Sequence, residues 1–120
     1  MNGKDKDREE RIHMEAVVDA YGPEERAMGW YYYLDDKISF PFAAKCIAVE
    51  KRSPLELGEK VKVLQMAGED NCEHDMYVDI SWAGRELMVR LAQLSPLNAD
   101  EDTIEAVGDW HYWVKQGYLF

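Results

Sequence analysis

The feature that most constrains the fold is a strict alternation of apolar and polar residues over residues 76–82, MYVDISW. A period of two is typical of a β-strand with one buried face. A second apolar run follows at residues 86–94. If Ala83 and Gly84 form a two-residue loop, the apolar faces of the two segments match in register. The expected cross-strand pairs are Ile80 with Leu87 and Val78 with Val89.

The remaining elements are predicted from apolar spacing and from proline and glycine. Pro41 biases the residue before it toward extended geometry, so helical structure is expected to stop ahead of it. We expect two helices joined by a tight bend before this point, two strands after it, and a closing helix with a capping box at Asp102 and Glu105. The expected segments are 10–21 and 22–36 for the first two helices, 43–51 and 60–66 for the strands, and 100–118 for the segment with the closing helix.

This order of elements predicts an α+β fold. Two N-terminal helices precede a small, strongly curved antiparallel sheet, and a C-terminal helix follows it. Short strands joined by short turns favour a sheet of the SH3-like barrel kind, with the helices packed outside it. The sheet alone would be small, so the aromatic faces of the helices are expected to complete the core.

The 120 residues suffice for one domain with one core. We expect residues 1–10 to be a disordered charged tail and residues 11–120 to form a single domain. The chain has no run of 18 apolar residues, and its charged start lacks the apolar stretch of a secretory signal. A cytoplasmic location without a membrane partner is therefore expected.

Net charge restricts the classes of partner. The chain carries 24 acidic and 14 basic residues, a net charge of −10. Binding to a phosphate backbone requires a basic face, so a nucleic-acid partner is not expected. The acidic excess favours a cation or a basic protein partner. Simple solubility is the alternative explanation.

Several kinds of site are not indicated by any motif. Cys46 and Cys72 are the only cysteines, and in a cytoplasmic chain they are expected to be reduced and buried. The paired Cys or His motifs of zinc sites are missing. Neither a Gly-x-Ser-x-Gly elbow nor a phosphate-binding loop is present. We therefore do not expect an enzyme.

Acidic residues gather at three places where loops or helix ends are expected, and a fourth group, Asp5, Asp7, Glu9 and Glu10, lies in the tail. Calcium prefers carboxylate, carbonyl and water oxygens in flexible loops. The EF-hand spacing is absent, because Ile104 stands where the next oxygen ligand after Asp100 and Asp102 would be needed. A calcium site would therefore be assembled from separate loops. The three groups are Asp35 with Asp36; Glu69, Asp70, Glu73 and Asp75; and Asp100, Glu101 and Asp102.

Each acidic group also has a structural explanation. Residues 100–102 could cap the last helix and complement its dipole. Residues 69–75 could be a solvated hairpin loop. Asp35 and Asp36 are expected near a helix C-terminus, where the dipole disfavours anions. They therefore need full solvation, the neighbouring Lys37 or a bound cation.

The segment DWHYWVKQGY, residues 109–118, places aromatic side chains on more than one face of a helix. One explanation is a core helix whose histidine is hydrogen-bonded. The alternative is an aromatic surface that docks a protein partner.

Four stretches together resemble a known family: ERIHMEAVVDAYGPEERAMGWYYYLDDKISFPFAAKC, GEKVKVLQMA, MYVDISWAGRELMVRLAQL and DTIEAVGDWHYWV. They are similar to the small acidic calcium-binding proteins of filamentous cyanobacteria, abbreviated CcbP, and to their bacterial relatives. The resemblance runs from about Glu10 to the C-terminus. It implies a calcium-binding protein without EF-hands. Asp35 and Asp36 match the acidic position of the family pattern best.

We therefore expect the chain to sequester or sense Ca²⁺ through loop carboxylates. Asp35 and Asp36 would form the first site, with backbone carbonyls near Ser39. A weaker second site would use Glu69, Asp70, Glu73 or Asp75, with residues 100–102 in reserve. The alternative function is an acidic SH3-like interaction module that binds a protein and no metal.

Overall fold

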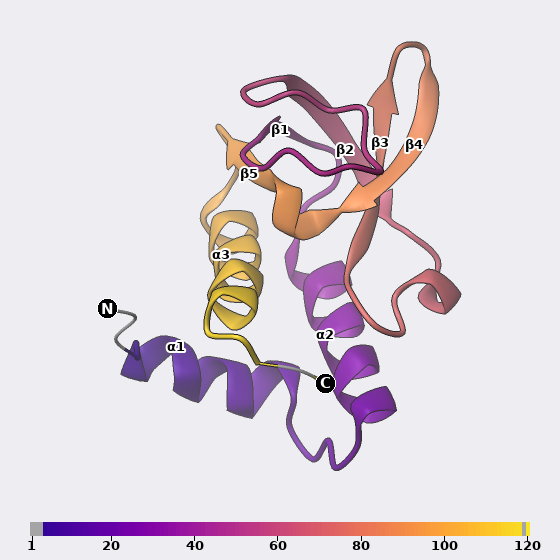
Figure 1. Cartoon of the computed structure of the whole chain (residues 1–120). Coiled ribbons are helices and arrows are strands. Elements are labelled where there is room, and N and C mark those ends of the chain that lie inside the picture. The colour runs from indigo at the N-terminus through magenta and orange to yellow at the C-terminus, as the bar shows by residue number, and fades with distance from the viewer. Residues whose placement is uncertain (1–3, 119) are drawn as a thin grey trace.

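A computed structural model describes residues 4–118 and residue 120 as an α+β protein. In its described part, three α-helices lie below a five-stranded antiparallel sheet (Figure 1). None of these helices is long and apolar enough to cross a bilayer. The elements in order are α1 (Lys6–Arg11), η1 (Ile12–Ala16), α2 (Pro23–Lys37), β1 (Phe42–Cys46), β2 (Lys60–Met66), η2 (Glu69–Asn71), β3 (Tyr77–Trp82), β4 (Arg85–Arg90), η3 (Leu91–Gln93), β5 (Leu94–Leu97) and α3 (Glu101–Lys115), where η1 is a π-helix and η2 and η3 are 3₁₀-helices.

The first helix is placed differently from the prediction. It begins at Lys6, within the segment expected to be a charged tail, because the Asp5 carboxylate accepts a hydrogen bond from the Arg8 backbone N–H at 3.1 Å. The helix continues into η1 and ends at Ala16, earlier than expected. Asp19 then adopts a φ of +54°, which is incompatible with a continuing helix. Residues 1–3 of the predicted tail lie outside the described residues.

Helix α2 begins where proline and glycine predicted it. Gly22 is the N-cap, and Pro23 occupies the first turn, where its missing N–H has no helical acceptor to lose. The helix ends at Lys37, because Ile38 takes an extended conformation (φ −79°, ψ 132°). Asp35 and Asp36 therefore lie in its last turn.

The hairpin predicted from residues 76–94 is confirmed in register. Strands β3 and β4 pair Val78 with Val89 and Ile80 with Leu87. Ala83 and Gly84 form the two-residue turn with φ values of 51° and 76°. Positive φ at both positions gives the turn a twist that matches that of the flanking strands.

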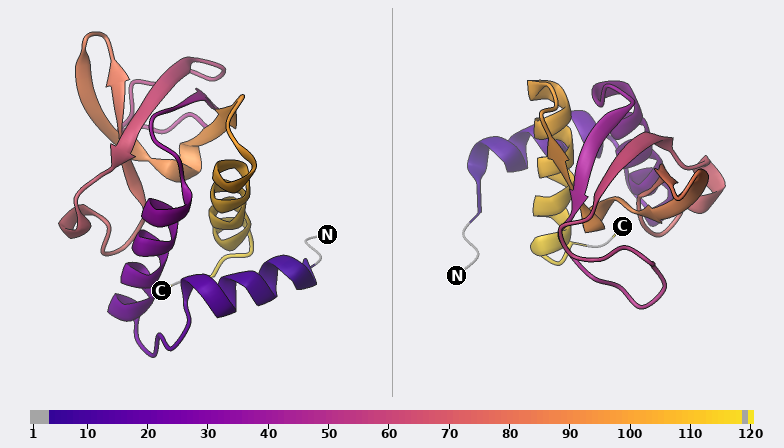
Figure 2. Two further views of the ribbon diagram at one scale, coloured as in Figure 1. Left: turned by 180° about the vertical axis from the view of Figure 1, so that it is seen from behind. Right: turned by 90° about the horizontal axis from the view of Figure 1, so that it is seen from above.

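The sheet is open, which corrects the predicted barrel. The strand order is β4-β3-β2-β1-β5, so β4 and β5 are its two edges. Residues 94–97 form β5, a strand that was not predicted as a separate element, and this strand pairs with β1. The short η3 turn carries the chain between the edges, and among the described residues no ladder joins β4 to β5. Helices α2 and α3 cover the apolar surface that barrel closure would otherwise bury (Figures 1 and 2).

Tryptophan side chains fill the space between α2 and α3. Trp30 on α2 is fully buried, and its ring centroid lies 5.0 Å from that of Trp110 and 5.5 Å from that of Trp113 on α3. Both contacts are edge-on, an arrangement that aromatic pairs favour. Cys46 and Cys72 are free and buried, as predicted.

A buried carboxylate connects the three α-helices. Asp109 on α3 has no exposed surface and accepts two hydrogen bonds from Arg11, at 2.7 and 2.9 Å. Tyr33 on α2 donates a third at 2.6 Å. Burial and this hydrogen bond raise the pKa of Tyr33 to about 12. Arg8 adds an ion pair with Asp109 at 3.2 Å, so one carboxylate joins both N-terminal helices to α3.

Helix α2 crosses the first helical segment at Gly29. A Cβ atom at this position would lie 2.2 Å from the backbone oxygen of Ala16. A backbone atom cannot move aside as a flexible side chain can. The hydrogen on Gly29 is therefore required for the close approach of α2 to η1.

We predict that Gly29→Ala lowers the free energy of unfolding by about 1–3 kcal/mol, because the added methyl group forces the two segments apart. In an unobstructed helix interior the same change would be stabilising by roughly 1 kcal/mol, so a loss identifies the contact. Urea denaturation measures the effect. Gly22→Ala, where no atom lies within 4 Å of the new Cβ, is the control. An unchanged or raised stability of Gly29→Ala would contradict the packing described.

Candidate metal site

Asp35 and Asp36 are both exposed in the last turn of α2. They stand at the negative end of the helix dipole. The neighbouring Lys37 does not point toward them, because its ammonium group is hydrogen-bonded to Glu105 and, at 3.1 Å, to the Tyr33 hydroxyl. These contacts raise the pKa of Lys37 despite its partial burial, which acts in the opposite direction. Lys37 therefore does not compensate the charge of the aspartates, which leaves solvation by water or a bound cation.

The two aspartates lie on different rows of the helix. Asp36 follows Gly29 and Tyr33 at helical spacing, toward η1. Asp35 follows Tyr31 and Tyr32 on the side of the loop after β2. Both carboxylates line a wide, shallow hollow that also includes Glu15 of η1. This hollow is rich in oxygen donors.

A second hollow of about 290 Å³ lies between the start of α2 and the loop that follows β2. Glu69, Asp70 and Glu73 line it from the loop side, and all three are exposed. Glu24 lines it from α2, together with Ala27 and Met28. The structure thus brings three of the four predicted loop acids to one wall and adds Glu24, which was not predicted as a site residue.

Tyr32 connects the two acidic groups. Its hydroxyl donates a hydrogen bond to Glu69, and this bond raises the pKa of Tyr32, with further contributions from burial and from the charges of Glu69 and Asp35. Burial raises the pKa of the neighbouring Tyr31, and Asp35 and Glu69 add to the effect. Asp35 and Glu69 therefore act on the same tyrosines along one side of α2. Tyr32 was not predicted as a site residue, although its spacing of three from Asp35 places both on one helix face.

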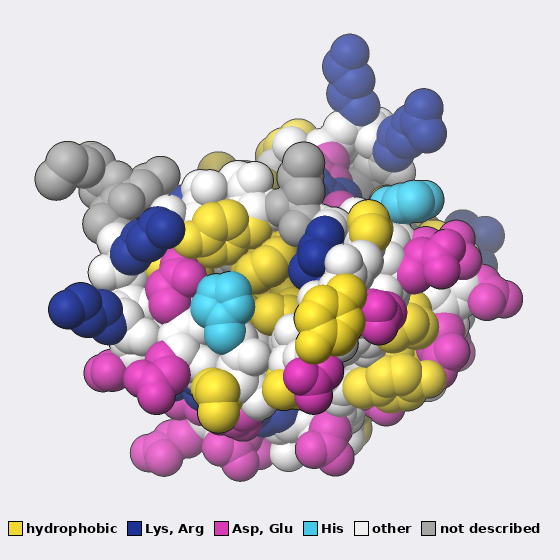
Figure 3. All heavy atoms as spheres, turned by 90° about the horizontal axis from the view of Figure 1, so that it is seen from below, with side chains coloured by type: hydrophobic (Ala, Val, Ile, Leu, Met, Phe, Trp, Pro, Cys, Tyr) yellow, Lys and Arg dark blue, Asp and Glu magenta, His cyan; other side chains and the backbone are white. Residues whose placement is uncertain are grey.

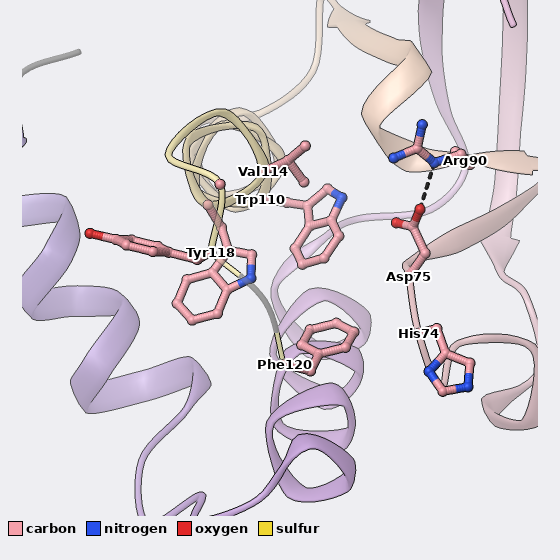
Figure 4. A pocket seen from close by; sticks show the side chains of 9 residues that line it. His74, Asp75, Arg90, Trp110, Val114, Tyr118 and Phe120 are labelled. Carbon is pink, nitrogen blue, oxygen red and sulfur yellow. Dashed lines mark hydrogen bonds and ion pairs between the residues drawn. The ribbon is translucent and has the colours of Figure 1, made fainter.

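Asp75 is separated from the other loop acids. Its carboxylate accepts a hydrogen bond from Arg90 Nε at 2.5 Å, and Arg90 also pairs with Glu50 at 2.7 Å. Figure 4 shows Asp75 directed toward Arg90, in a pocket walled by Trp110 and Phe120. Its negative charge is thus balanced within the protein.

The third acidic group caps α3. Asp100 is the N-cap, and its carboxylate accepts the backbone N–H of Thr103 at 2.7 Å. Hydrogen bonds from Thr103, and then from Ser39, lower the pKa of Asp100. The capping residue is therefore Asp100 rather than the predicted Asp102. Ser39 lies beside this group, and its backbone N–H donates to Thr103 Oγ1 at 2.9 Å. Glu101 and Asp102 are exposed in the first turn.

The aromatic side chains of α3 belong largely to the core. Trp110 and Trp113 are buried, and His111 contacts the backbone oxygen of Leu94 through Nε2 at 2.6 Å. Burial lowers the pKa of His111. These contacts agree with the core-helix explanation of residues 109–118.

The chemistry of the donors suits a hard divalent cation. Acidic side chains are spread over the helical end of the molecule (Figure 3). They offer carboxylate oxygens, which calcium prefers, whereas both thiols are buried. Within the described residues, no three Asp, Glu, His or Cys side chains already converge on one point. Coordination would therefore need rotation of exposed carboxylates, with backbone oxygens or water completing the shell.

Comparison with known proteins identifies the family. A profile of the calcium-binding CcbP family matches residues 10–114. The crystal structure of CcbP from Anabaena superposes with a TM-score of 0.88 at 43% sequence identity, covering 98% of this chain and 97% of that one.

A calcium-binding protein solved in its calcium-binding form gives the same TM-score at 41% identity, with 99% and 98% of the two chains covered. Among curated proteins, no significant match was found. The chain belongs to the calcium-binding CcbP family.

Proposed function

We propose that this protein binds Ca²⁺ through exposed carboxylates on either side of Tyr32, and that it acts as a non-enzymatic calcium-sequestering protein of the cytoplasm, without EF-hands. The observation that carries the proposal is its 41% identity, over 99% of the chain, to a protein solved in a calcium-binding form. The first site would lie at Asp35, with Asp36 adjacent to it and Glu69 across from it.

Electrostatics supports this assignment. Asp35 and Asp36 repel each other and oppose the dipole of α2, while Lys37 is engaged by Glu105. A divalent cation would offset both the repulsion between the two carboxylates and their unfavourable interaction with the helix dipole. Asp75 is neutralised by Arg90, and Asp100 caps α3. Among the described residues, the Glu69 carboxylate accepts a hydrogen bond only from the neutral Tyr32 hydroxyl, which makes it the stronger candidate.

A second, weaker site would lie in the hollow formed by Glu24, Asp70 and Glu73. Ser39 and residues 100–102 would contribute only to a third position at the start of α3. We favour sequestration over sensing because the carboxylates involved are exposed and the framework beneath them is fully packed. Filling such sites reorients side chains without opening the core.

We predict that Ca²⁺ binds with a dissociation constant on the order of micromolar and that Mg²⁺ produces little heat in the same calorimetric titration. Asp35→Asn with Asp36→Asn should weaken calcium binding at least tenfold, because each change removes an anionic ligand. At about 100 times the dissociation constant, calcium should stabilise the wild-type protein by roughly 2.7 kcal/mol.

The matched control is Asp7→Asn with Glu10→Gln, which removes the same charge from exposed positions of α1. Equal weakening in the control would mean that net charge alone attracts the ion. Unchanged affinity in the Asp35 and Asp36 variant would refute the site, and the absence of calcium binding by the wild-type protein would refute the function.

We also predict that the Asp35 and Asp36 variant is more stable than the wild type when calcium is removed with EDTA. Its thermal midpoint should rise by roughly 1–4 °C, because two charges that oppose the helix dipole and repel each other are lost. Differential scanning calorimetry measures the midpoint. The Asp7 and Glu10 variant should show no such rise, since Asp7 lies in the first turn of α1, where the dipole favours an anion. A fall in the Asp35 and Asp36 variant would show that these carboxylates serve folding.

A further inference from the structure

The positive charge of this acidic protein is concentrated in one segment. Residues 45–62 contain five basic and three acidic residues, whereas the rest of the chain contains nine basic and 21 acidic ones. The five cations are Lys45, Lys51, Arg52, Lys60 and Lys62. They lie on β1, on β2 and on the loop between these strands, and all are exposed. We call this segment the basic loop.

None of these five cations has an ion-pair partner among the described residues. In the helical half Arg8, Arg11 and Lys37 are paired. Lys6 and Lys115 are exposed without an ion pair in the described part of the chain, but they stand far apart in the sequence. Lys45 and Lys60 even stand directly opposite each other on β1 and β2. Like charges at opposed strand positions are destabilising. The basic loop thus keeps an uncompensated positive surface that the fold itself does not use.

Aliphatic side chains are exposed on the same loop. Ile47, Val49 and Leu57 are 42%, 68% and 69% exposed, whereas Leu55, two residues before Leu57, is 1% exposed. Leu55 therefore anchors the loop in the core. The loop is ordered by its backbone, and the exposure of the other three does not come from an unstructured segment.

The backbone of the loop extends the β1–β2 hairpin. The Gly58 N–H donates to the Cys46 oxygen at 2.8 Å, and the Cys46 N–H donates to the Glu59 oxygen at 2.8 Å. These bonds place Ile47 and Leu57 beside each other at the neck of the loop. Figure 2 shows the loop projecting from the body of the molecule.

The three acidic residues of the loop offset its charge only in part. Glu50 is paired with Arg90 at 2.7 Å. Glu59 accepts hydrogen bonds from the Trp82 indole N–H at 2.9 Å and from the Glu56 backbone N–H at 3.0 Å. Of the three, Glu56 alone is exposed, and the other two are partly buried.

We infer that the basic loop docks on an anionic phospholipid surface, with its cations contacting the headgroups and its exposed aliphatic side chains adding apolar contact. The exposed apolar side chains of the loop are aliphatic rather than aromatic, which argues against nucleic acid, whose bases would stack on aromatic rings. The loop projects from the body of the molecule, which suits a membrane plane. Lys51 and Arg52 also line a hollow of about 230 Å³ with Met88, so the experiment below includes an acidic peptide. This inference replaces the sequence-based expectation of no membrane partner, which rested on the lack of a spanning segment.

The net charge of −10 does not prevent this docking. The molecule is 40 Å long, and exposed charges are screened beyond a Debye length of about 8 Å at physiological ionic strength. The electrostatic interaction with a membrane therefore depends mainly on the charges of the face that contacts it. The acidic helical half, which carries the proposed calcium site, would remain in water.

Vesicle co-sedimentation of the full-length protein in EDTA tests the inference independently of calcium binding. We expect partition onto phosphatidylcholine vesicles containing 30% phosphatidylserine and none onto pure phosphatidylcholine. Lys51→Ala with Arg52→Ala should weaken binding at least fivefold, since each cation near the surface contributes roughly fivefold. Val49→Ser with Leu57→Ser should also weaken it at least fivefold.

The control is Lys6→Ala with Lys115→Ala, which removes two exposed cations far along the chain from the loop and should leave partition unchanged. Thermal midpoints of all variants show that they are folded. Absence of partition by the wild type, equal partition on neutral vesicles, or equal loss in the control would each overturn the inference. So would capture of a glutamate-rich peptide without any vesicle binding, which would identify an acidic protein as the partner.

Discussion

The carboxylate of Asp109 is the interaction on which the arrangement of the helices depends. It is fully buried and is neutralised by Arg11 and Arg8 while Tyr33 donates to it. Helix α1 buries none of its own residues, so these polar contacts, rather than apolar packing, hold it against α3. Removing one partner of such a group leaves a buried charge unpaired, which is strongly destabilising. A single acid on α3 thereby sets the positions of α1 and α2 together.

The acidic end of α2 is positioned by this arrangement. Trp30 and Tyr33 hold one side of the helix against α3, and Lys37 is drawn to the same side by Glu105. Asp35 and Asp36 nevertheless remain exposed in the last turn of the helix. Lys37, the cation next to these aspartates in the sequence, is bonded to Glu105 and Tyr33 instead. The negative charge of the aspartates therefore stays uncompensated at the surface, where an ion can reach it.

The sequence predicted the parts of the fold that depend on local pattern. The register of Val78 with Val89 followed from alternation and a two-residue turn alone. The start and end of the first helix did not, because they depend on a cap at Asp5 and on contacts with Asp109, some hundred residues away. The sheet stays open because α2 and α3 cover its apolar surface. The area that the helices cover cannot be deduced from the pattern of the strands. The acidic groups were visible in the sequence, but the pairing of Asp75 with Arg90 follows only from tertiary structure.

Anomalous diffraction from crystals of the calcium-loaded protein tests the central claim most directly. If the packed helices leave the negative charge at the end of α2 uncompensated, calcium should bind there. We predict an anomalous peak within 2.3–2.6 Å of carboxylate oxygens of Asp35 and Glu69, with the helices unmoved. A peak only beside Asp100, or a site assembled by displacement of α2 from α3, would contradict it.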